Sequence, residues 1–273
     1  MSPPYRRAST ELNGGMVQGR VTRGTTGTNR LRRMDRWIAA HPVLRRTTDP
    51  LIVDLGYGAS AWTTIELFAR LREVRPDARV TGLEIDPVRV RLAAPHARPG
   101  LDFAVGGFDV PLDGGRRPAV IRAANVLRQY DEHEVPGAWR LMRERLQPGG
   151  LLLEGTSNEV GRVASWVGLD PQGPRTLTIS LHLPSLEHPS IVAQRLPKAL
   201  IHRNVPGERI YTLLRDLDAH WAHHAALDAF SARQRWVATV QSLRDAGWPV
   251  RDTAARWRLG ELTVDWGAVA PLP

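Results

Sequence analysis

The sequence predicts an α/β protein built on a mostly parallel sheet, and two apolar runs with a helical pattern between them are the main evidence. The run 51–60 (LIVDLGYGAS) indicates a buried strand that ends in an acid and two glycines. The run 78–86 (ARVTGLEID) indicates a second strand that ends in acids. Between them, residues 61–75 carry apolar side chains at helical spacing. A strand, a crossover helix and a second strand form one βαβ unit, from which such sheets are built.

The turn after the first strand carries two glycines, Gly56 and Gly58. Because glycine has no Cβ, the backbone there can adopt conformations closed to other residues, and a ligand can come close to the main chain. Glu84 ends the second strand, where an acid can accept both hydrogens of a ribose diol. Together these residues indicate a nucleotide-type cofactor site, although an ordinary βα turn would carry the same two glycines.

Five segments in order extend this pattern along the chain. They are VDLGYG at 53–58, GLEID at 82–86, VGGFDVPL at 105–112, AANVL at 123–127 and LQPGGLLL at 146–153. In this order they resemble the class I S-adenosylmethionine-dependent methyltransferases over about residues 50–160, with a weaker match near the C-terminus. The resemblance implies a Rossmann-like, seven-stranded sheet that is mostly parallel with an antiparallel last strand. It also implies helices on both faces and an inserted substrate cap.

The resemblance implies that the cofactor is S-adenosyl-L-methionine. By that resemblance, Asp54, Gly56 and Gly58 would line the methionine part of the cofactor, and Tyr57 between the glycines is counted among the cofactor-binding residues. Glu84 would hold the ribose hydroxyls.

The adenine and methyl ends of the cofactor are assigned in the same way. Gly107, Phe108 and Asp109 match the segment that flanks the adenine, and Asn125 matches the position nearest the methyl group. The chain departs from the family between the third and fourth strands, where 113–118 is too short for the usual helix. We therefore expect a thin or otherwise covered sheet edge on that side.

Methyl transfer from a sulfonium is an in-line displacement, so the protein mainly aligns the acceptor and excludes water. An alcohol acceptor must also lose its proton to a nearby base. Asp131 and His133 after the fourth strand, and Glu159 after the fifth, are the candidates able to accept a proton. Each of them could instead be an ordinary surface or helix-capping residue.

Four segments are expected along the chain. Residues 1–48 form a basic N-terminal arm and a lid helix, and 49–159 form the cofactor-binding core. Residues 160–226 form an insertion, because a predicted hairpin and two helical patterns separate the fifth strand from the closing helix. Residues 227–273 supply the last core helix and the closing strands. An insertion there would stand above the carboxyl edge of the sheet and cap the substrate.

The amino-acid composition indicates where the protein is located and excludes several kinds of catalysis. With 42% hydrophobic and 24% charged residues, and with neither a predicted membrane span nor a secretory signal, the chain is expected to be cytoplasmic. It has no cysteine, which excludes disulfides, cysteine zinc sites, cysteine-ligated iron–sulfur clusters and thiolate catalysis. Polar methyl transfer, with no metal in the site, is what we expect.

The net charge of +9 raises the question of the partner. We expect a methyl acceptor that is a small molecule or a saccharide, methylated on oxygen or nitrogen. An RNA acceptor bound by the basic arm is an alternative, and a non-catalytic, cofactor-binding accessory protein is another. A dinucleotide oxidoreductase is disfavoured because Ala61 and Trp62 stand where its third glycine would fall. The sequence does not predict the oligomeric state.

Overall fold

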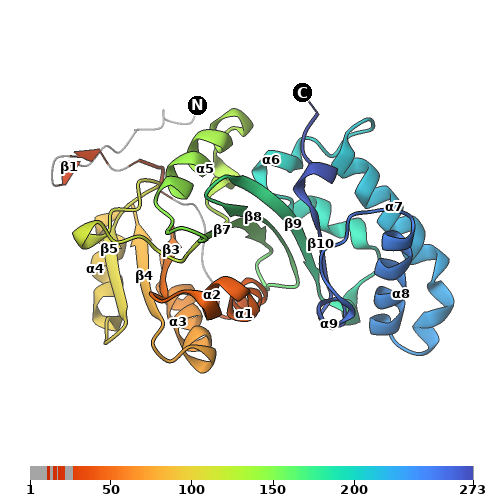
Figure 1. The fold of residues 1–273 in the computed structure, drawn as a ribbon, viewed down its shortest axis with the longest axis horizontal. Coiled ribbons are helices and arrows are strands. Elements are labelled where there is room, and N and C mark those ends of the chain that lie inside the picture. The colour runs from red at the N-terminus through yellow and green to blue at the C-terminus, as the bar shows by residue number, and fades with distance from the viewer. Residues whose placement is uncertain (1–10, 13–14, 17, 22–26, 273) are drawn as a thin grey trace, which may run out of the picture.

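A computed structural model describes residues 11–12, 15–16, 18–21 and 27–272. Most of the predicted N-terminal arm lies outside these residues. One eight-stranded sheet runs through the protein (Figure 1). Its strands are β3 (Leu51–Leu55), β4 (Arg79–Glu84), β5 (Leu101–Val105), β6 (Val120–Ala124), β7 (Leu151–Ser157), β8 (Val163–Asp170), β9 (Gly173–Leu181) and β10 (Glu261–Asp265). A separate two-stranded ladder pairs β1 (Glu11–Leu12) with β2 (Gly15–Met16).

The strands follow the order β10-β9-β8-β7-β6-β3-β4-β5. The five strands from β5 to β7 are parallel to one another, whereas β8, β9 and β10 each run antiparallel to their neighbour. The predicted α/β class, a mostly parallel sheet whose last strand is antiparallel, is confirmed. The sheet has eight strands instead of the expected seven.

The additional strands come from the segment that we assigned to the insertion. The predicted hairpin over 162–183 is present as β8 and β9, but it continues the main sheet instead of standing apart from it. The inner residues of β8 are all buried, so this strand needs cover on both faces, which a place inside the sheet supplies. The expected closing strand pair is reduced to a single antiparallel bridge between Val250 and Val264, and β10 pairs along its length with β9.

Helices cover both faces of the sheet. They are α1 (Arg32–Ala40), α2 (Pro42–Arg46), α3 (Trp62–Val74), α4 (Pro87–Ala93), α5 (Val135–Glu144), α6 (Lys198–Ile201), α7 (Arg209–His223), α8 (Ala232–Asp245) and α9 (Ala254–Trp257). One hydrophobic core joins α1 and α3 to the sheet, and a larger one joins α5, α7 and α8 to it. In Figure 1, α7 and α8 pack together beyond the β10 end of the sheet.

The chain reverses direction across the sheet between β3 and β6. It passes from β3 outward to β4 and β5, and then returns to the other side of β3 as β6 and β7. Ligands of open α/β sheets bind beyond the carboxyl ends of the strands at such a reversal point. Leu55, Glu84, Ala124 and Ser157 end the four strands that meet there.

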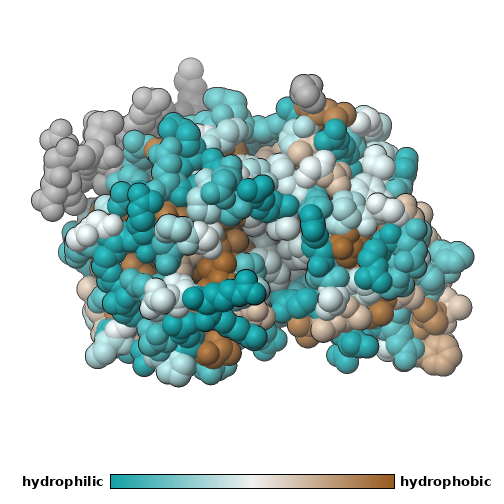
Figure 2. Space-filling view, in the orientation of Figure 1, coloured by the Kyte–Doolittle hydropathy of each residue, from teal (hydrophilic) through white to brown (hydrophobic). Residues whose placement is uncertain are grey.

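Between β5 and β6 the described chain has one short 3₁₀ turn, Asp113–Gly115, as its spacing predicted. None of the helices among residues 27–272 is both long and apolar enough to cross a membrane. Figure 2 shows a mostly hydrophilic surface on the face drawn, with apolar residues in small scattered groups.

Candidate functional site

The glycine turn and Glu84 meet at the carboxyl edge of the sheet. Gly56 and Gly58 have φ angles of 69° and 87°, a region that favours glycine. The N–H of Gly58 donates to Glu84 Oε2 at 2.8 Å, and the N–H of Ile85 donates to Glu84 Oε1 at 2.9 Å. Glu84 is only 1% exposed. Its carboxylate is therefore held against the glycine turn.

Asp54 faces into the protein. Its carboxylate accepts two hydrogen bonds from Arg122, at 2.8 and 2.6 Å, and a third from the Thr64 hydroxyl at 2.7 Å. Arg122 also bonds Asp35, whose pKa is raised to about 6 because it is buried. Asp54 is 2% exposed, so its part in a methionine site would be to support the turn from below. We did not select Arg122 from the sequence, although a charge within an apolar strand is a usable signal.

Tyr57 lies between the two glycines and is buried. Its ring contacts Phe103 edge-on, with centroids 5.5 Å apart. Burial, together with the carboxylates of Glu84 and Asp54, raises the pKa of its phenol. The side chain thus stays neutral and packs in a small apolar cluster with Ala61 and Ala93.

The segment expected to flank an adenine follows β5. The N–H of Gly107 donates to Asp109 Oδ1 at 3.3 Å. Phe108 is buried, and its ring centroid lies 5.3 Å from that of Tyr130. Val110 has φ 42°, which is a strained conformation for a β-branched residue. Such strain persists only where the surrounding structure holds it in place, and it concentrates at functional sites.

Residues 18–21, which we call the N-terminal strap, lie on this segment. The N–H of Phe108 donates to the Gln18 carbonyl at 2.9 Å, and a Cβ on Gly107 would come within 2.0 Å of the same oxygen. The backbone N–H of Arg20 donates to the Tyr130 hydroxyl, and its guanidinium lies 4.7 Å from the centre of that ring. The strap therefore takes up the hydrogen bond that the Phe108 N–H could otherwise donate to a ligand.

Asn125 follows β6 with φ 61°, a conformation that asparagine tolerates better than most residues. Its Oδ1 accepts from the Ser157 N–H at 3.0 Å, and its own N–H donates to the Gly155 carbonyl at 2.7 Å. These bonds fix the side chain between the carboxyl ends of β6 and β7.

The three candidate bases have different surroundings. Asp131 forms a capping box with Glu134, which satisfies backbone N–H groups at the start of a short 3₁₀ turn, Glu132–Glu134. His133 is exposed on that turn. Glu159 lies in the β7–β8 turn and bonds Arg195 at 3.0 Å. A hydrogen bond from its own backbone, with help from Arg195 and Arg30, holds the pKa of Glu159 below its usual range.

Arg195 bonds Glu159, and the charge of Glu159 also acts on Arg30 and Arg128. We define these three residues, Arg30, Arg128 and Arg195, as the arginine cluster. Arg30 donates to the Ser157 carbonyl at 3.1 Å, and Arg128 donates to the Gln194 carbonyl at 3.2 Å. Burial first, and then the charges of the neighbouring arginines, lower the pKa of both Arg30 and Arg128. We did not predict this cluster, because its members lie far apart in the sequence.

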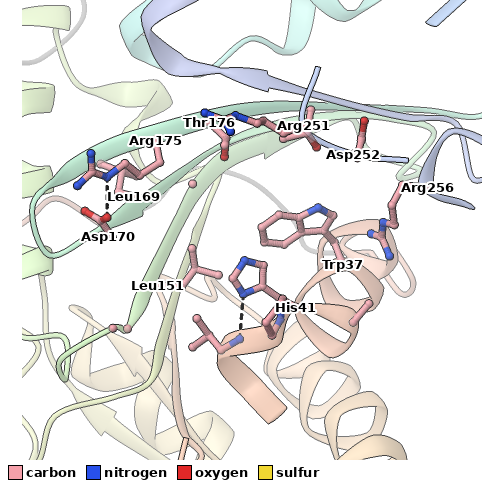
Figure 3. Close-up of a pocket in the computed structure, with 17 residues that line it drawn as sticks. Trp37, His41, Leu151, Leu169, Asp170, Arg175, Thr176, Arg251, Asp252 and Arg256 are labelled. Atoms are coloured by element: carbon pink, nitrogen blue, oxygen red, sulfur yellow. Dashed lines mark hydrogen bonds and ion pairs between the residues drawn. The ribbon is translucent and has the colours of Figure 1, made fainter. Parts of the chain in front are cut away.

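A cavity of about 450 Å³ lies elsewhere, on the α1 and α2 side of β7, β8, β9 and β10 (Figure 3). Trp37 and His41 stack along its wall with ring centroids 4.7 Å apart, and Asp252 and Arg256 also line it. Burial lowers the pKa of His41 to about 4, so its imidazole is neutral. None of the residues that we predicted for the cofactor or the catalytic site lines this cavity.

No family model and no curated protein matches the chain. Among solved structures, human N-acetylserotonin methyltransferase, a complex with S-adenosylmethionine, aligns with a TM-score of 0.34 and 23% identity, over 45% of this chain and 32% of its own. The CcbJ methyltransferase from Streptomyces caelestis aligns with a TM-score of 0.36 and 20% identity, over 56% and 66% of the two chains. The [4+2]-cyclase SpnF aligns with a TM-score of 0.34 and 22% identity, over 45% and 44%.

The match therefore spans about a third of the human enzyme and two thirds or less of the other two proteins. One of these neighbours is described as a cyclase and not as a methyltransferase. The fold assignment rests on the strand order and the crossover pattern of the sheet.

Proposed function

We propose that the protein is an S-adenosylmethionine-dependent methyltransferase that acts on oxygen or nitrogen of a small molecule or saccharide. The observation that carries this proposal is the position of Glu84. Its buried carboxylate is fixed by the Gly58 N–H at the reversal point of a mostly parallel sheet. A ribose diol laid across that carboxylate would direct the rest of the cofactor along the turn.

The residues present fit this cofactor at its ribose and methionine ends. Gly56 and Gly58 leave the backbone open to close approach, and Glu84 supplies the acceptor for the hydroxyls. At the adenine end, the N–H of Phe108 already donates to Gln18, so a bound adenine would take the place of the strap there. The cofactor, when bound, supplies an activated methyl group on a positive sulfur.

The chain's own residues would align the acceptor and remove its proton. Asn125, fixed by its bond to Ser157, would orient an acceptor group at the carboxyl end of β6. Asp131, His133 and Glu159 remain the proposed bases, with His133 foremost. Asp131 is engaged as a helix cap, and the lowered pKa of Glu159 makes its carboxylate a weaker base.

Calorimetry on the full chain tests the proposal with S-adenosylmethionine, S-adenosylhomocysteine and NAD as probes. We expect both sulfur compounds to bind and NAD not to bind. Glu84→Ala should weaken binding by at least tenfold, whereas the exposed Glu73→Ala serves as a matched control and should not change it. Failure of both sulfur compounds to bind would contradict the proposal, and binding of NAD instead would support an oxidoreductase.

An RNA acceptor is the second candidate, favoured by the net charge of +9. Methyl transfer from labelled cofactor into fractions of a cell extract separates the two acceptor classes. Label that nuclease treatment releases would identify RNA. Label that resists nuclease would support a small-molecule or saccharide acceptor. An absence of label despite tight cofactor binding would favour a non-catalytic accessory protein.

A further inference from the structure

The arginine cluster is assembled from three separate parts of the chain. Arg30 precedes α1, Arg128 lies in a 3₁₀ turn after β6 (Leu127–Gln129), and Arg195 ends a 3₁₀ helix after β9 (Pro189–Arg195). The main chain of Arg195 is tied to the sheet, because its carbonyl accepts from the hydroxyls of Thr156 and Ser165, each at 2.5 Å. The sheet therefore fixes the position of the cluster.

Charge is unbalanced within the cluster. Glu159 is the carboxylate that pairs with Arg195 and contributes to the electrostatic field at Arg30 and Arg128, and its side chain is 73% exposed. Within the described part of the chain, this one solvated carboxylate stands beside the guanidinium groups of both Arg128 and Arg195. Like charges held close together cost free energy, which an added anion would offset.

The cluster lies beside the predicted methyl position. Ser157 connects the two, because its N–H donates to Asn125 and its carbonyl accepts from Arg30. The cluster therefore lies close enough to Asn125 for one acceptor molecule to contact both. Arg128 and Arg195 each use one terminal nitrogen in their bonds to Gln194 and Glu159 within the described residues, so further N–H donors remain for a ligand.

We propose that the arginine cluster is an acceptor subsite. It binds one oxyanion group of the molecule to be methylated, either a carboxylate or a phosphate. Planar guanidinium groups match the geometry of both oxyanions. This inference rests on the proposed function, since it names the class of acceptor for the same site. The proposed acceptor is a small anionic molecule. Preferential binding of RNA is one of the results that the test can distinguish.

The test is calorimetric titration of the full chain with two probes, inorganic phosphate and acetate, in a low-salt buffer. We expect Arg128→Gln and Arg195→Gln each to weaken binding of the preferred probe by about fivefold or more. Glu159→Gln should tighten it several-fold, because the internal carboxylate no longer competes with the probe. The tighter-binding probe identifies which oxyanion the subsite prefers.

Arg140→Gln is the matched control, because Arg140 is an exposed arginine on α5 that pairs with Glu144. Binding should be unchanged in this variant. The inference fails if Glu159→Gln and Arg128→Gln both stay within twofold of the parent, or if Arg140→Gln weakens binding equally. It also fails if a short single-stranded RNA binds far more tightly than either small anion and loses that binding in Arg128→Gln.

Failure of this inference and failure of the proposed function give different results. Each variant is also titrated with S-adenosylhomocysteine. If S-adenosylhomocysteine binds normally and neither anion binds, only the oxyanion subsite is overturned. Anion binding that depends on the cluster, with no binding of either sulfur compound, would overturn the methyltransferase proposal and leave an anion site of another function.

Discussion

At the residue scale, Arg122 connects two buried carboxylates. It bonds Asp54 on β3 with two nitrogens and Asp35 on α1 with a third, and all three side chains are fully or almost fully buried. Removing one partner of a buried ion pair leaves an uncompensated charge in the interior. The glycine turn begins two residues after Asp54, at Gly56, so its position depends on this triad.

Replacing Arg122 by leucine should therefore destabilise the fold severely. We expect Arg122→Leu to lower the free energy of unfolding by about 3–5 kcal/mol, because Asp54 loses its counter-ion and Asp35 keeps only its ion pair with Arg70. Urea denaturation measures the change. Arg79→Leu removes an arginine from the exposed pair with Asp49 and should cost less than about 1 kcal/mol. Similar losses in the two variants would contradict this account of the triad.

At the element scale, the capping box before α5 gives Asp131 a structural role. Its side chain accepts from the Glu134 N–H, and the Glu134 side chain accepts from its backbone in return. We expect Asp131→Ala to lower the free energy of unfolding by about 1 kcal/mol, the usual value of an N-cap. Affinity for S-adenosylhomocysteine should stay the same.

The neighbouring His133→Ala serves as the control, because His133 is exposed and does not take part in the capping box. Its stability should match that of the parent in the same denaturation experiment. If Asp131→Ala unfolds at the same urea concentration as the parent, the cap contributes nothing measurable.

The N-terminal strap makes a second prediction at this scale. Arg20 anchors it through an ion pair with Glu134 at 2.7 Å and through its contacts with Tyr130. Because the strap holds the Phe108 N–H, loosening it should free the adenine end of the site. We expect Arg20→Ala to tighten binding of S-adenosylmethionine several-fold, as measured by calorimetry.

Arg36→Ala changes the net charge by the same amount at an exposed position of α1 and should leave the affinity unchanged. Weaker binding in Arg20→Ala would show the opposite role for the strap, namely that it forms a wall of the cofactor site.

At the scale of the whole molecule, buried carboxyl groups should dominate the dependence of stability on pH. Burial raises the pKa of Asp35 and Asp252 to about 6, of Glu261 to about 7 and of Glu154 to about 8. A carboxyl whose pKa is higher in the folded state favours folding while protonated, and this contribution is lost as pH rises through that pKa. The unfolding free energy should therefore fall between pH 5 and pH 8.

His41 acts in the opposite direction, because a buried neutral imidazole favours folding above pH 6.5 and loses that contribution as pH falls towards 4. Glu154→Gln isolates the carboxyl effect. We expect it to flatten the decline between pH 5 and pH 8 by about 1–3 kcal/mol in urea denaturation. Glu73→Gln at an exposed position is the control. Parallel pH profiles for the parent and Glu154→Gln would refute this expectation.

Much of this organisation is visible in the sequence because it is local. The βαβ unit, the glycine turn and Glu84 follow from periodicity and spacing, and the structure brings Gly58 and Glu84 into contact. The pattern Asp131-x-x-Glu134 also indicates a capping box, and helix capping is the alternative that the sequence offers for Asp131 beside a role as base.

The arrangement of the remaining parts depends on contacts between distant segments. The apolar runs of β8 and β9 predict a hairpin, but they do not predict whether the hairpin joins the main sheet. A strand that is buried on both faces shows no alternation of apolar and polar residues, so its sequence does not indicate which strand lies beside it. The arginine cluster joins residues 30, 128 and 195, and no local signal connects them. The strap is likewise defined by a contact between positions 18 and 108.

The triad of Asp35, Arg122 and Asp54 also has an evolutionary consequence. Asp35 also pairs with Arg70, so two carboxylates face two guanidinium groups, and loss of any one of the four leaves charge unbalanced. Few single substitutions at these positions should therefore leave the stability unchanged. The three positions should therefore change together among relatives, as a set that is either all ionic or all apolar. Such joint variation would identify chains that share this architecture even where overall sequence similarity is too low to detect them.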